Sequence, residues 1–166
     1  MKHHFDILEK QEQMLRFEHF CQSDALALGT LMARRAQEAD LTVAISIRLG
    51  NGVILFQYLP DGTNALNENW MRRKFNTVMA MSCSSLKEAF SMEEKGSTLA
   101  DQGLNETDYA LCGGGFPIRI RGSEVVIGAV VASNLYHIAD HEFVTGALRK
   151  YLGCPDVPEY PFTLPE

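Results

Sequence analysis

The fold class of this 166-residue chain is decided by the stretch TVAISIRLGNGVILFQYL, residues 42–59. Within it, residues 43–49 alternate between large apolar side chains and smaller or polar ones, which is the period of a half-buried strand. Gly50-Asn51-Gly52 follows, and these residue types tolerate the positive φ that tight turns require. Residues 53–59 then return as a second, more apolar strand. The stretch therefore predicts an antiparallel β-hairpin.

Helices are expected on both sides of this hairpin. Apolar residues recur at three- and four-residue steps over residues 6–21 and 24–39 before it, and over 64–82 and 84–95 after it. The same spacing over residues 138–152 predicts a closing helix. The hairpin thus lies between two pairs of helices, with one more helix near the end of the chain.

A second hairpin is expected between the last two of these helices. Residues 109–112 are a short strand candidate that runs into a glycine triplet, and residues 116–121 and 125–133 predict two further strands. Consecutive hairpins favour an antiparallel sheet, so we expect an α+β fold with helices packed on the sheet. We expect one domain over residues 1–166, with a core at about 20–152. Four prolines predict an extended tail over residues 155–166.

Composition excludes several classes of protein. Fifteen basic against 21 acidic side chains give a formal charge of −6, so we expect no nucleic-acid partner. The longest uncharged apolar run, residues 125–132, is far shorter than the ~20 residues that cross a bilayer, so we expect no membrane partner. The first residues lack the apolar core of a signal peptide, which predicts a cytoplasmic protein. The four cysteines form no C-x-x-C pair, and we expect neither a disulfide framework nor a metal site.

The triplet Gly113-Gly114-Gly115 has two interpretations. Without side chains the backbone can approach a ligand closely, and successive N–H groups can form an anion-binding nest. Glycines next to a strand are also typical of a bulge that lets the sheet edge turn. The triplet matches neither the G-x-G-x-x-G pattern nor a phosphate-binding loop.

His137 and His141 are the second candidate. Residues four apart on a helix share one face, so both rings could bind a metal or haem iron, with Asp140 orienting one of them. In the structural interpretation, Asp140 interacts favourably with the positive start of the final helix. His141 is then a packed, hydrogen-bonded residue on the same stripe as Val144 and Leu148.

A basic pair beside an aromatic residue is the third candidate. Arg73 and Lys74 follow Trp70 and could grip a carboxylate or a propionate, since guanidinium binds such groups bidentately. Alternatively, these charges cover a solvated helix face or a subunit contact. The chain has no G-x-S-x-G elbow or other activated nucleophile, so the sequence assigns no catalytic residue.

Four segments occur together in a familiar order. They are Trp70-x-x-Arg73-Lys74, residues 108–118, residues 126–133 and Asp140-His141-Glu142. In this order the chain, over roughly residues 20–152, resembles the haem-degrading-domain family of GlcG-like and haem-binding HbpS-like proteins. It is most similar to a branch of small cytosolic proteins of uncharacterised activity.

The resemblance implies a profilin-like (GlcG-like) α+β fold, with an antiparallel sheet flanked by helices, and a closed homo-oligomer. It also implies a binding module without demonstrated catalysis, whose ligand is haem or another small anionic molecule. The ligand-binding residues expected on these grounds are Gly113, Gly114, Gly115, His137, Asp140, His141, Arg73 and Lys74. If haem is the ligand, a histidine would hold the iron and the basic pair would meet the propionates.

Where the family often has Ser-Gly after the last strand, this chain has Ser133-Asn134, and asparagine also adopts left-handed backbone angles. Two alternatives to a binding module stay open. One is an oxidative haem-degrading enzyme, which needs an axial ligand, an open face for oxygen and an electron source. The other is a non-catalytic assembly or adaptor protein, whose helices and proline-rich tail would contact a partner.

Overall fold

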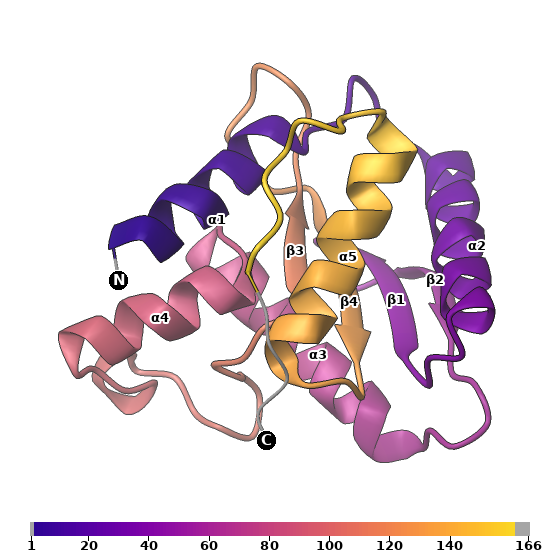
Figure 1. Ribbon diagram of the computed structural model, residues 1–166. Helices are drawn as coiled ribbons and strands as arrows, with labels where there is room; N and C mark the ends of the chain where they lie inside the picture. The colour runs from indigo at the N-terminus through magenta and orange to yellow at the C-terminus, as the bar shows by residue number, and fades with distance from the viewer. Residues whose placement is uncertain (1, 162–166) are drawn as a thin grey trace.

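The computed structural model describes residues 2–161, which form helices packed around one sheet (Figure 1). In chain order the elements are α1 (Lys2–Met14), α2 (Gln22–Glu38), β1 (Ala44–Leu49), β2 (Ile54–Tyr58), α3 (Ala65–Met81), α4 (Ser85–Lys95), a short 3₁₀ helix (Ala100–Gln102), β3 (Gly115–Ile118), β4 (Gly128–Ser133) and α5 (His137–Leu152). No helix within the described residues is long and apolar enough to span a membrane.

The four strands form one sheet in the order β2-β1-β4-β3, and each neighbouring pair is antiparallel. Ile45 lies opposite Tyr58 on one side and opposite Ala132 on the other. Both predicted hairpins are present, because β1 pairs with β2 and β3 pairs with β4. The α+β fold with an antiparallel sheet is therefore confirmed.

Helices cover both faces of the sheet, with α2 and α5 on one face and α3 on the other (Figure 1). Ile45 and Ile47 point into the core with α2 and α5, whereas Ala44 packs with Met71 and Val78 of α3. The prediction that this strand is half-buried is therefore wrong. Alanine and serine are small enough to admit a helix on the face that the sequence pattern assigned to solvent.

Residues 109–112 form no strand, which corrects the sequence-based expectation. Instead, this segment runs along α3 and bonds to its side chains. The Thr77 hydroxyl accepts a hydrogen bond from the Ala110 N–H (3.1 Å) and donates one to the Ala110 carbonyl (3.0 Å). Arg73 donates to the Tyr109 carbonyl at 3.3 Å. The backbone groups that a strand would pair with a neighbour are thus satisfied by a helix surface.

The first helix ends at Met14, earlier than the expected residue 21. Beyond it, Phe17 pairs with the end of the second hairpin: its N–H donates to the Arg119 carbonyl at 2.9 Å, and its carbonyl accepts from the Arg121 N–H at 2.8 Å. Phe17 is buried in the main core. Burial of this ring and pairing with the sheet edge outweigh the modest helical pattern.

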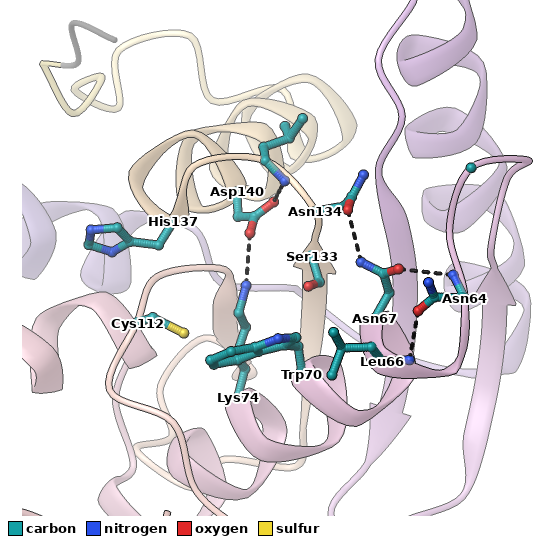
Figure 2. Close-up of a pocket in the computed structure, with 12 residues that line it drawn as sticks. Asn64, Leu66, Asn67, Trp70, Lys74, Cys112, Ser133, Asn134, His137 and Asp140 are labelled. Carbon is teal, nitrogen blue, oxygen red and sulfur yellow. Dashed lines mark hydrogen bonds and ion pairs between the residues drawn. The ribbon is translucent and has the colours of Figure 1, made fainter. Parts of the chain in front are cut away.

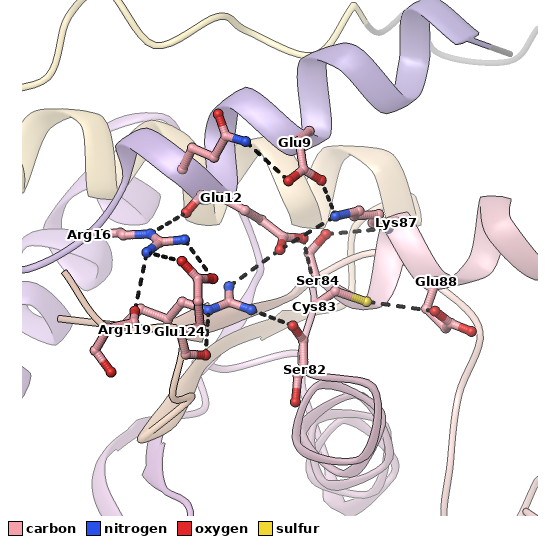
Figure 3. Close-up of polar contacts among 12 residues, drawn as sticks. Glu9, Glu12, Arg16, Ser82, Cys83, Ser84, Lys87, Glu88, Arg119 and Glu124 are labelled. Carbon is pink, nitrogen blue, oxygen red and sulfur yellow. Dashed lines mark hydrogen bonds and ion pairs between the residues drawn. The ribbon is translucent and has the colours of Figure 1, made fainter. Parts of the chain in front are cut away.

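A buried polar cluster joins α1 to the α3–α4 turn and the end of β3 (Figure 3). Glu12 accepts a hydrogen bond from the Ser84 N–H at 2.8 Å and pairs with the Arg119 guanidinium at 3.3 Å. Arg119 also donates to the Ser82 carbonyl. Burial raises the pKa of the neighbouring Cys83 thiol to about 12, so this cysteine is protonated and unreactive near neutral pH. The cluster therefore holds α1, the α3–α4 turn and the end of β3 together.

The tail beyond α5 runs back between α1 and α4 as far as it is described. Gln11 of α1 donates to the Pro158 carbonyl and to the Glu142 carboxylate, both at 2.9 Å, and Glu142 accepts from the Tyr160 N–H at 2.8 Å. The Tyr160 side chain is buried. We call residues 155–161 the strap; the rest of the predicted extended tail, residues 162–166, lies outside the described part of the chain.

One buried ion pair connects α3, β4 and α5. Lys74 Nζ donates to Asp140 Oδ2 at 2.8 Å and to the Ala132 carbonyl at 2.9 Å, and both charged side chains are only 2% exposed. The second carboxylate oxygen of Asp140 accepts from the Leu135 N–H at 3.0 Å. Burial raises the pKa of Asp140, while the Lys74 ammonium opposes that rise.

We expect Lys74→Met to destabilise the fold by about 3–5 kcal/mol at neutral pH, because it leaves a buried carboxylate without its partner. The loss shrinks as the pH falls. Burial holds the pKa of Asp140 above its unfolded value, so at low pH the folded variant binds a proton there and no longer contains an unpaired buried charge. Urea unfolding of the wild type and the variant at pH 7 and at pH 5 measures both effects. Lys74→Met/Asp140→Asn is the control and should recover most of the loss. A pH-independent loss would contradict this account.

Candidate functional site

A cavity of about 360 Å³ opens between the first turns of α3 and α5, at the end of β4 (Figure 2). We call it the α3–α5 pocket. Its lining residues are Gly62, Asn64, Leu66, Asn67, Trp70, Lys74, Cys112, Ser133, Asn134, Leu135, His137 and Asp140. Its size lies at the lower end of the ~300–1,000 Å³ typical of small-molecule sites.

The α3 side of the pocket follows from helix geometry. Asn64 caps the helix, with its side-chain oxygen accepting from the Leu66 N–H at 2.9 Å. Asn67, Trp70 and Lys74 then follow at three- and four-residue steps, which places them on one face of the helix. Sequence spacing alone thus brings an amide, an indole and an ammonium to the same cavity wall.

Amide-to-amide hydrogen bonds fix the side of the pocket next to β1. Asn67 accepts from the Asn64 N–H at 3.0 Å and donates to the Asn134 side-chain oxygen at 3.1 Å. Asn134 donates in turn to the Thr42 carbonyl at 2.8 Å. The backbone of Asn134 has φ of 111°, so the asparagine tolerates a positive angle in the β4–α5 turn, as the sequence suggested.

His137 lies at the pocket in the first turn of α5 and is half-buried. Burial, together with the nearby Lys74 charge, lowers the pKa of its imidazole, so the ring is neutral at pH 7. Its Nδ1 accepts a hydrogen bond from the Gly113 N–H at 3.3 Å. A neutral imidazole that accepts at Nδ1 carries its proton on Nε2. His137 therefore carries an N–H donor, and not a free lone pair, on Nε2.

Ser133 contributes a hydroxyl to the site. The residue is 4% exposed, and its Oγ makes no hydrogen bond with any other described residue. Figure 2 shows this hydroxyl pointing into the cavity, between Trp70 and the Lys74–Asp140 pair. An unbonded hydroxyl that is open to a cavity can donate to or accept from a ligand atom there.

The Cys112 thiol lines the pocket beside these groups. Burial raises its pKa, which keeps the thiol protonated. Within residues 2–161, no three His, Cys, Asp or Glu side chains are placed to share a metal ion. The described lining residues offer hydrogen bonds and apolar contacts.

The structure brings three of the predicted side chains together, since Lys74, His137 and Asp140 all line the pocket. It does not bring His141 there. That ring is 1% exposed, its Nε2 lies 2.8 Å from the Gln11 side-chain oxygen, and burial lowers its pKa to about 3. This is the packed, hydrogen-bonded histidine of the structural interpretation.

Arg73 also lies outside the pocket. Its guanidinium stacks 4.2 Å from the centre of the Trp70 ring and lines a second cavity, of about 330 Å³, which shares Trp70 and Cys112 with the α3–α5 pocket. Arg73 and Lys74 are adjacent in sequence but point in different directions from the helix. The predicted basic pair thus does not act as a pair at this pocket.

The glycine triplet is required by close packing. A Cβ on Gly113 would overlap the His137 carbonyl oxygen, and one on Gly114 would lie 2.8 Å from Lys74 Nζ. Gly114 also has φ of +121°, which side chains disfavour. None of the three glycines lines the pocket. Their absent side chains let the chain pass between α3 and the start of α5.

The sequence-based site missed Asn64, Asn67, Cys112 and Ser133, and it assigned Trp70 mainly to the core. A usable signal existed in the spacing Asn64-x-x-Asn67-x-x-Trp70-x-x-x-Lys74, which places two amides in line with an indole on one helix face. No comparable signal marked Ser133, since its exposure to a cavity depends on the packing of α3 against β4.

Comparison with known proteins gives consistent matches. A family model described as haem degrading protein HbpS-like matches residues 20–149. A UPF0303 protein of Rhizobium rhizogenes is 42% identical over 143 residues, which cover 86% of this chain and 87% of the relative.

Solved structures share the fold. The crystal structure of the Ybr137w protein matches with a TM-score of 0.83 and 25% identity, over 90% of this chain and 88% of that chain. The crystal structure of a PduOC:haem complex matches with a TM-score of 0.65 and 20% identity, over 78% of this chain and 92% of that chain. The resemblance found in the sequence is thus confirmed, and the chain belongs to the HbpS-like haem-degrading protein family.

Proposed function

We propose that this protein binds a small organic ligand in the α3–α5 pocket. One observation carries the proposal: the hydroxyl of the largely buried Ser133, without a partner among the described residues, opens into a cavity with an apolar wall of Trp70 and Leu135. Small-molecule sites combine such apolar walls with a few polar groups that orient the ligand. The ion pair beneath the cavity keeps these groups in fixed positions before a ligand arrives.

The only tryptophan of the chain, Trp70, lines this pocket and makes binding measurable. We expect a saturable change in its fluorescence with at least one of five four-carbon probes: butanoate, butanamide, 1-butanol, butylamine or n-butyl phosphate. Cys112→Met should abolish the change by filling the pocket. Cys154→Met, at a half-buried cysteine outside the pocket, should leave it intact. No response to any probe, or a response indifferent to Cys112→Met, would contradict the proposal.

Haem is the second candidate ligand, because the family description names haem degradation and one structural neighbour is a haem complex. The described residues do not fit haem in this conformation. The hydrogen bond from Gly113 to His137 Nδ1 leaves a proton on Nε2, the nitrogen that would have to bind iron. Lys74 has only one N–H donor left beside Asp140 and Ala132, and Arg73 lies across Trp70 outside the pocket, so the two do not form a basic pair for the two propionates of haem.

A haemin titration tests this misfit. We expect no saturable Soret shift that depends on His137, so His137→Ala and the wild type should give the same spectra. His141→Ala serves as the matched histidine control, since that ring is buried away from the pocket. A saturable shift that disappears in His137→Ala alone would assign the axial ligand and establish haem as the ligand.

We also propose that the protein forms a homo-oligomer. Exposed apolar side chains support this: Ile54 on the edge strand β2 is 43% exposed, and Val53 just before it is 50% exposed. An edge strand also presents unpaired backbone groups to a second chain. Contact through β2 would remove both kinds of surface from water.

Light scattering coupled to size-exclusion chromatography checks the assembly. We expect a mass at a multiple of the 18.5 kDa chain, shifted toward the monomer by Ile54→Glu, which places a charge on the edge strand. Lys95→Glu, at the exposed end of α4, is the control and should not change the mass. A wild-type protein that elutes as an 18.5 kDa species would contradict the proposed assembly.

A further inference from the structure

We infer that the α3–α5 pocket takes a small monocarboxylate. Its carboxylate would lie between the Ser133 hydroxyl and Lys74, and its organic part would pack against Trp70 and Leu66. The inference rests on the proposed function, since it names the class of ligand for the same pocket. It goes further by assigning the polar contacts and by excluding amide, amine and phosphate head groups.

Several hydrogen-bonding groups of the pocket's lining residues are left unused by the protein itself. The side chains of Asn67 and Asn134 are already engaged in the hydrogen bonds along the pocket wall. Two side-chain donors of lining residues are left, the NH₂ of Asn64 and the indole N–H of Trp70, neither of which has a hydrogen-bond partner among the described residues. A ligand that satisfies them must be rich in acceptors.

Lys74 adds a charged donor to this set. An ammonium group has three N–H donors, and two of them are used, by Asp140 Oδ2 at 2.8 Å and the Ala132 carbonyl at 2.9 Å. The third has no acceptor in the described chain, and Lys74 lines the pocket beside Ser133. A carboxylate offers only acceptors, about four lone-pair sites in all, and can bond to Lys74 and Ser133 together.

The charge of the site favours one negative charge on the ligand. Lys74 and Asp140 cancel each other, and His137 is neutral at pH 7. The remaining positive contributions are the starts of α3 and α5, each of which carries a partial charge of roughly +0.5. A monoanion is balanced by this field and by the Lys74 donor, whereas a phosphate dianion would bring a second charge that no described pocket residue neutralises.

The apolar side of the pocket receives the rest of the ligand. Trp70 presents one face to Arg73 and borders the α3–α5 pocket as well, and Leu66 is 60% exposed at its rim. A short hydrocarbon chain that extends from the carboxylate toward Leu66 would cover this exposed side chain. Neither a bare inorganic anion nor a sugar would make that contact.

Fluorescence of Trp70 tests the inference with three matched probes that share a four-carbon chain: butanoate, butanamide and n-butyl phosphate. We expect butanoate to bind at least about tenfold more tightly than the other two. Ser133→Ala should weaken butanoate binding about tenfold or more, because a hydrogen bond to a charged group is lost. Ser133→Thr keeps the hydroxyl and should retain most of the affinity.

Ser46→Ala is the matched control, because Ser46 is a buried serine on the adjacent strand β1 whose hydroxyl bonds to Arg48 and Gln57. It should leave butanoate affinity unchanged. Equal binding of butanoate and butanamide, preference for the phosphate, or full affinity in Ser133→Ala would overturn the inference while the proposed function stands. A tryptophan signal that no probe of any class moves would overturn both.

Discussion

A lysine and an aspartate that are both removed from water must stay together, and this requirement organises the centre of the molecule. Lys74 and Asp140 are 2% exposed, so separating them would leave two uncompensated charges in the interior. Lys74 also holds the Ala132 carbonyl, and Asp140 holds the Leu135 N–H. The pair thereby fixes the first turn of α5 relative to α3 and β4, and the glycine triplet must stay free of side chains to pass it.

The Lys74–Asp140 ion pair also determines which groups of the pocket remain available to a ligand. The charges of Lys74 and Asp140 neutralise each other, and the asparagines of the pocket form hydrogen bonds with one another along one wall. The groups left for a ligand are a hydroxyl, several N–H donors and one spare hydrogen on Lys74. The family description names haem degradation, whereas the histidine at this pocket carries its proton on Nε2 in this chain.

Local patterns in the sequence predicted the hairpins and the helices, because alternation and turn residues such as Gly50-Asn51-Gly52 act within a few positions. They could not predict that β1 is buried on both faces, since that depends on α3 packing against Ala44. For the same reason residues 109–112 were mistaken for a strand, although their backbone partners are side chains of α3. Of the site, Lys74, His137 and Asp140 were predictable by residue type, whereas Ser133 acquires its role only through tertiary packing.

Both α1 and the strap lie outside residues 20–149, the part of the chain that matches the family model. Yet they supply Gln11, which bonds to His141, and Tyr160, which packs with Leu86 of α4. Segments outside the range of the family model thus complete the packing of α5 in this chain. A chain reduced to residues 20–149 would leave the buried His141 ring without its Gln11 partner, so the stretch that the family model matches does not close its own core.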